Sequence, residues 1–193
     1  MLPTRLAAAR RGAVAALLMG SLALGPFVRA QAIVYDGTPD LALASAMVAA
    51  GGGPKRFSSR QLFHAVTGSL EAAEAKKLAD QFGPADVANT FAVFDFAVKD
   101  VVRVATAAHV ALPPPSPDPT DGKALALALY GAGITPTGKW DVGYMLEHMI
   151  SHPIHHAIMH DMDAEFGAAR NGRFHIVLEQ MMDDLAVAYG TAR

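Results

Sequence analysis

Apolar residues recur every three or four positions along much of the chain, and no segment sustains an alternation of apolar and polar residues. The first pattern indicates amphipathic α-helices, whereas half-buried strands would need the second. The clearest apolar stripe lies in the segment 84–110, which Pro84 opens. The stripe consists of Val87, Phe91, Phe94, Val98, Val101, Val102 and Ala105. The pattern predicts an all-α fold in which this stripe faces the core.

Glycines, prolines and capping residues indicate where the helices begin and end. Ser58 with Gln61 three residues later predicts a capping box, and Ser69 is expected to cap the next helix. The whole pattern predicts a compact bundle of about six helices, and both globin-like and four-helix-bundle-like packing fit it. Helical segments are expected at 40–50, 58–67, 69–83, 84–110, 122–130 and 144–166 and in a terminal helix at about 174–189.

A proline-rich run at 113–119 separates two helical halves. Such a run lacks the backbone donors of a helix and favours a stiff, extended link. Neither half is large enough to bury a good core by itself. We therefore expect one helical domain at 33–193, with 113–119 as a loop within it.

The first 32 residues have the three-part pattern of a secretory signal peptide. Arg5, Arg10 and Arg11 form a basic start, residues 12–28 are almost entirely apolar, and the small residues Ala30 and Ala32 follow. The adjacent pair Arg10 and Arg11 also fits a twin-arginine export signal. The sequence thus predicts a signal peptide at 1–32 and a periplasmic or secreted protein.

Charge and cysteine content exclude several functions. The segment 1–32 holds four of the 16 lysines and arginines and none of the 18 acidic residues, so the remainder has 12 basic and 18 acidic residues, a net charge of −6. An acidic domain without a basic patch is a poor nucleic-acid binder, and it lacks a polybasic membrane-surface segment. With no cysteine, the chain can form neither disulfides nor thiolate ligands, and covalent c-type haem attachment is excluded.

The most unusual segment is rich in histidine and methionine. Five of the eight histidines lie within residues 148–160, and four methionines lie among or beside them. On a single helical wheel the histidines and methionines fall on one half, and aliphatic residues fall on the other. Neutral imidazoles four residues apart can bind one ion together, as His152 with His156 or His156 with His160.

This pattern predicts a transition-metal site, with copper or zinc as the ion. Methionine beside histidine, in a chain without thiols, favours copper. Because 148–160 is too long for all five imidazoles to meet at one ion, ligands from elsewhere are also needed. The candidate ligands are His148, His152, His155, His156, His160 and Asp163, with His109, His175, Met181 and Met182 as possible additions.

Pro153 interrupts the histidine segment and disfavours helical geometry at His152. Either the helix kinks there, or Ser151 caps a new helix with Pro153 in its first turn. Both alternatives place His148 and His152 at a bend.

Two other functions fit the same residues. Phe91, Phe94 and Phe96 with one axial histidine could hold a non-covalent haem, and a helical interaction domain without a cofactor would leave the histidines as half-exposed polar residues. For an enzyme, the sequence offers no His-Glu-x-x-His, Gly-x-Ser-x-Gly or phosphate-binding glycine loop, and no pair of Glu-x-x-His units. It therefore assigns no reaction.

Overall fold

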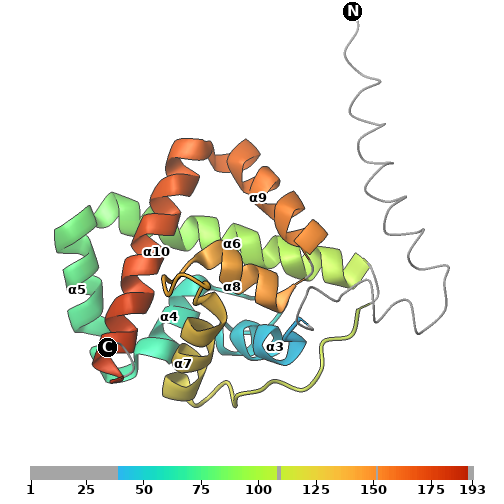
Figure 1. Cartoon of the computed structure of the whole chain (residues 1–193), viewed down its shortest axis with the longest axis horizontal. Helices are drawn as coiled ribbons and strands as arrows, with labels where there is room; N and C mark the ends of the chain where they lie inside the picture. The colour runs from blue at the N-terminus through green and yellow to red at the C-terminus, as the bar shows by residue number, and fades with distance from the viewer. Residues whose placement is uncertain (1–38, 108–109, 151, 191–193) are drawn as a thin grey trace, which may run out of the picture.

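The computed structural model describes residues 39–107, 110–150 and 152–190. Within these residues the chain forms eight α-helices, one short 3-10 helix and no strand, which confirms the all-α prediction (Figure 1). The seven segments expected from the sequence form eight α-helices, because the segment at 144–166 forms two. The helices are α3 (Leu41–Ala50), α4 (Ser59–Thr67), η1 (Gly68–Leu70), α5 (Glu71–Phe82), α6 (Pro84–Ala107), α7 (Gly122–Gly133), α8 (Val142–Met149), α9 (His152–Phe166) and α10 (Ala168–Ala188).

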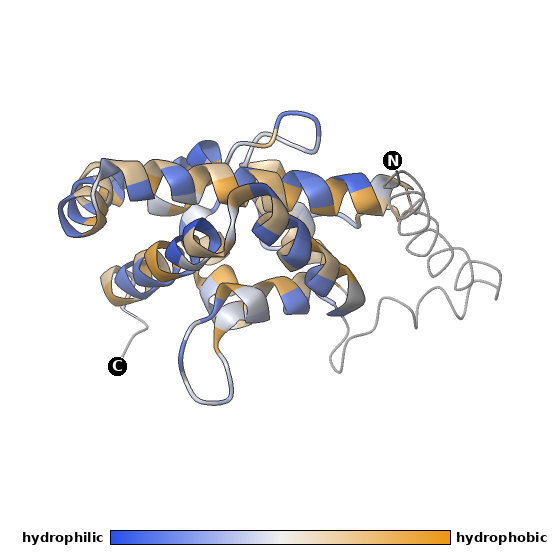
Figure 2. Cartoon of the chain, turned by 90° about the horizontal axis from the view of Figure 1, so that it is seen from above, coloured by the Kyte–Doolittle hydropathy of each residue, from blue (hydrophilic) through white to orange (hydrophobic). Residues whose placement is uncertain are grey.

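The core forms where the long helices α6 and α10 pack against each other. The ring of Phe174 on α10 is fully buried and stacks on Phe94 of α6, with ring centroids 6.1 Å apart. Most helices carry both hydrophilic and hydrophobic residues (Figure 2). Phe94 and Val98 of the predicted stripe are buried in the core, and so is Val93, which the stripe did not include. Phe91 is only partly buried and packs against the core. The predicted stripe therefore faces the core at its middle and lies at the edge of the core elsewhere.

Two predicted caps are wrong. Ser58 is the N-cap of α4 but makes no side-chain capping bond, and the backbone N–H of Ser59 instead donates to Asp95 Oδ1 of α6 at 2.5 Å. Ser69 lies inside η1, and α5 follows Leu70 without a side-chain cap. The N–H of Ser58, which a capping box would pair with the Gln61 side chain, donates to the carbonyl of Gly51 at 2.8 Å.

The proline-rich loop at 113–119 connects α6 with α7 and runs past α3. The backbone N–H of Ser116 donates to the carbonyl of Ala42 on α3 at 3.1 Å. One hydrophobic cluster includes residues from both sides of this loop, such as Phe94 and Leu125.

The predicted signal peptide at 1–32, and His109 and Ser151, lie outside the described residues. Among the helices that the structure describes, none combines the length and apolar composition needed to cross a membrane.

The break between α8 and α9 decides how the histidines are arranged. Ile150 follows α8 in an extended conformation, with φ −138° and ψ 163°, and α9 begins at His152 with Pro153 in its first turn. Pro153 tolerates this position because a first-turn residue has no helical hydrogen bond to lose. The structure therefore has a new helix after the bend, and a single helical wheel does not extend across Pro153.

Candidate metal centre

Glu147 at the end of α8 and three histidines at the start of α9 come together across this break. Each of these side chains offers one ligand atom, and all four atoms lie within 4.8 Å of one another. His152 Nδ1 lies 2.8 Å from Glu147 Oε1, and His155 Nδ1 lies 3.2 Å from the same oxygen. Tetrahedral zinc with bonds of about 2.0–2.2 Å needs its ligands roughly 3.3 Å apart. A small displacement of these groups would therefore admit an ion. The fourth member of the group is His156.

The environment of His155 favours its neutral form. His155 is 7% exposed, and burial lowers its pKa. Glu147 opposes this effect, while the nearby His156 and His152 lower the pKa further. A neutral imidazole has a free lone pair, which metal binding requires. Because His152 and His156 are exposed, an ion can reach the cluster from solvent.

Three of the six predicted ligands, His152, His155 and His156, belong to this cluster. His148 lies on α8, where its Nδ1 is 3.0 Å from the carbonyl oxygen of Tyr144.

The other two predicted ligands also point elsewhere. His160 is exposed and lies 3.6 Å from Asp161. Asp163 accepts a hydrogen bond of 2.8 Å from the buried Asn171 of α10. These two residues lie farther along α9 than the break that gathers the cluster.

Glu147 was missed by the sequence analysis. It lies five residues before His152, a spacing that joins no two side chains on one continuous helix. The change of direction after Ile150 brings its carboxylate to the start of α9. Pro153 was the available signal, because a new helix beginning there faces the end of the previous one.

The neighbouring methionines serve the core. Met145, Met149 and Met162 are buried in the main hydrophobic cluster, and Met159 packs against it. Flexible thioether side chains fill such irregular spaces well. The argument that favoured copper over zinc therefore loses its support, since the gathered ligands offer nitrogen and oxygen.

A second group of potential ligands lies beside the first. Asp141, which precedes α8, lies near His175 and Glu179 of α10, with one ligand atom of each within 4.8 Å of the others. Burial lowers the pKa of His175, and burial followed by the charge of Asp141 raises the pKa of Glu179. His175 was among the additional ligands considered from the sequence. Asp141 was missed because it lies far from α10 along the chain. Glu179 was missed although it follows His175 at a four-residue spacing on α10.

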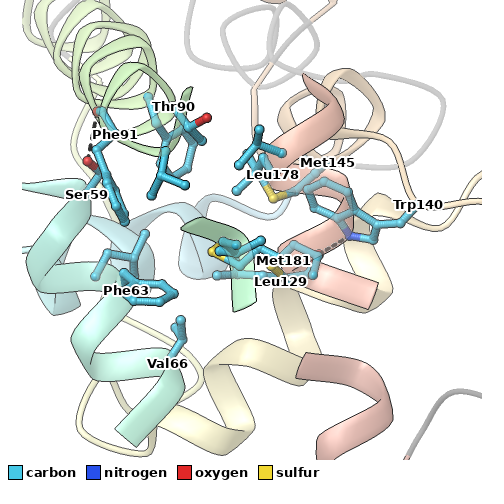
Figure 3. Close-up of a pocket in the computed structure, with 16 residues that line it drawn as sticks. Ser59, Phe63, Val66, Thr90, Phe91, Leu129, Trp140, Met145, Leu178 and Met181 are labelled. Atoms are coloured by element: carbon cyan, nitrogen blue, oxygen red, sulfur yellow. Dashed lines mark hydrogen bonds between the residues drawn. The ribbon is translucent and has the colours of Figure 1, made fainter. Parts of the chain in front are cut away.

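The phenylalanines proposed for haem surround only a small cavity. Phe91 and Phe94 line an apolar space of about 30 Å³ between α4, α6 and α10 (Figure 3). That volume holds little more than a water molecule, whereas ligand pockets span about 300–1,000 Å³. Phe96 packs on Phe166, with ring centroids 5.4 Å apart. Non-covalent haem binding stays a prediction from the sequence.

Both groups of potential ligands are identified by the geometry and chemistry of this chain. Comparison with protein-family models, with curated proteins and with solved structures finds no match.

Proposed function

We propose that the protein is an exported metal-binding protein that holds one transition-metal ion through Glu147, His152, His155 and His156. The observation that carries the proposal is the approach of three imidazoles and one carboxylate to within 4.8 Å at the break between α8 and α9. The pattern of the first 32 residues supports export.

The donor set supports zinc as the first ion to test. Three nitrogens and one oxygen suit the tetrahedral coordination of zinc. Imidazole also suits copper and nickel, which makes these ions the appropriate comparison. Because protons compete with the ion for the imidazoles, zinc affinity should fall as the pH is lowered.

The test is an isothermal titration of the untagged, chelator-treated protein with zinc at pH 7. The double substitution His152→Ala and His156→Ala removes two ligands. Even loss of an outer-shell partner costs about 10- to 100-fold in metal affinity, so loss of two direct ligands should cost at least about 100-fold.

The matched control removes two histidines elsewhere. His64 and His160 have side chains that are 71% and 76% exposed, and neither belongs to the cluster. Replacing both by alanine should change zinc affinity by less than about 3-fold, within ordinary context effects of surface substitutions. Equal losses in the two double variants, or no binding by the wild type, would contradict the proposal. The second result would favour an interaction domain without a cofactor.

A further inference from the structure

His155 lies between the two groups of potential ligands. Its Nδ1 lies on the side of Glu147, 3.2 Å from Oε1. Its Nε2 is buried and has no hydrogen-bond partner among the residues that the structure describes. A buried imidazole nitrogen without a partner is unfavourable in a folded protein, and a recurring explanation is an ion or water that completes it.

Gly143 marks the space that this nitrogen faces. A Cβ built on Gly143 would lie 3.4 Å from His155 Nε2 and 3.0 Å from Asp141 Oδ1. The same small space therefore borders the unpartnered nitrogen and a carboxylate of the second group. A side chain at position 143 would crowd both.

The electrostatics of the second group suit a cation. Asp141 and Glu179 bring two carboxylates together, and the charge of Asp141 adds to burial in raising the pKa of Glu179. Asp163 and Asp183 add further negative charge near the group, with Lys139 as an opposing charge. A bound divalent ion would relieve this repulsion and would use the lone pair of His175.

We propose that Asp141, His175 and Glu179 form a second divalent-metal position, which His155 Nε2 borders across the space at Gly143. This position goes beyond the proposed function, with which it shares His155. Two carboxylates and an imidazole make a harder donor set than the first group, and the second position should accept Mn²⁺. The protein would then hold two ions on opposite sides of one imidazole ring.

The experiment is a Mn²⁺ titration of the untagged, chelator-treated full chain, followed by the loss of the free-ion signal in electron paramagnetic resonance. The wild type should bind one equivalent with micromolar affinity. Glu179→Gln should weaken binding at least about 10-fold. This variant should fold normally, because the amide has the shape of the protonated carboxyl, and a urea midpoint checks it. Gly143→Ala should weaken binding too, since its methyl group fills the space beside His155.

Two controls separate this proposal from the first one. Glu165→Gln removes an exposed carboxylate of α9 and should leave Mn²⁺ affinity unchanged. The double substitution His152→Ala and His156→Ala should weaken zinc binding at the first group at least about 100-fold and change Mn²⁺ affinity less than about 3-fold. In the wild type, Mn²⁺ binding without any zinc binding would overturn the proposed function alone.

Three results would overturn the second position. These are no Mn²⁺ binding by the wild type at millimolar ion, unchanged affinity in Glu179→Gln, and a loss that follows the His152 and His156 substitutions rather than Glu179.

Discussion

Glu74 provides a direct test of the electrostatics between α5 and α10. Its side chain is 8% exposed and lies beside Asp184, whose Oδ1 is 2.6 Å from Lys77 Nζ. Burial, and after it the charge of Asp184, raise the pKa of Glu74 from 4.5 to about 7, against the opposing charge of Lys77. Within the described part of the chain, one oxygen of each carboxyl is buried without a hydrogen-bond partner, so two negative charges here are poorly compensated.

The shift sets the direction of the pH dependence. Between pH 4.5 and 7 the folded protein binds a proton at Glu74 that the unfolded chain has released, so this group's contribution to stability is present at low pH and is lost as the pH rises. Each pKa unit corresponds to 1.36 kcal/mol, which bounds the effect at about 3 kcal/mol. Solvent near the half-exposed Lys77 screens the charges, and we expect about 1–2 kcal/mol.

Glu74→Gln removes the titration while keeping the shape of the protonated side chain. The free energy of unfolding should be measured by urea denaturation from pH 5 to 8, with chelator present so that bound ions do not contribute. The free energy of unfolding of the variant, minus that of the wild type, should become more positive by about 1–2 kcal/mol as the pH rises across this range. Glu165→Gln, at an exposed position of α9, supplies the baseline. A difference for Glu74→Gln that is flat or falls with pH would refute the reasoning.

Three further substitutions test the packing. Phe174→Ala should lower the free energy of unfolding in urea by about 3–5 kcal/mol, because the ring is fully buried; a loss below about 1 kcal/mol would contradict its place in the core. Asp121→Ala should cost about 1 kcal/mol in the same assay, since Asp121 Oδ1 caps α7 through Ala124 N at 3.0 Å; unchanged stability would argue against the cap. Gly122→Ala should lower the melting temperature, because the new Cβ would lie 1.8 Å from the carbonyl oxygen of Ala65. The expected loss in the free energy of unfolding is about 1–3 kcal/mol. A melting temperature equal to that of the wild type would show that α4 and α7 are not so closely packed.

Local spacing predicted the helical class and several boundaries. Pro84 begins α6, and Gly51 and Gly83 follow α3 and α5, because glycine and proline act on the backbone at their own positions. Ser58 and Ser69 failed as side-chain caps. The start of α4 is instead tied to α6 by contacts that no local pattern contains.

The sequence predicted the three histidines of the candidate site but not Glu147. His152, His155 and His156 lie within one turn and a little more of α9, and their spacing alone brings the imidazoles together. The same reasoning added His148 and His160 from a single helical wheel, although Pro153 already indicated a kink or a new helix at this point. The break at Ile150 and the direction of α9 separate both from the cluster.

The sequence by itself determined an all-helical chain, the approximate ends of most helices and the concentration of histidines at the start of α9. The tertiary structure decided which side chains from other segments join them. Glu147 reaches the histidines only because α8 and α9 meet at a bend, and Asp141 meets Glu179 only because α10 packs beside α8. Spacing along a helix specifies neighbours within that helix, whereas contacts between helices depend on how the whole core packs.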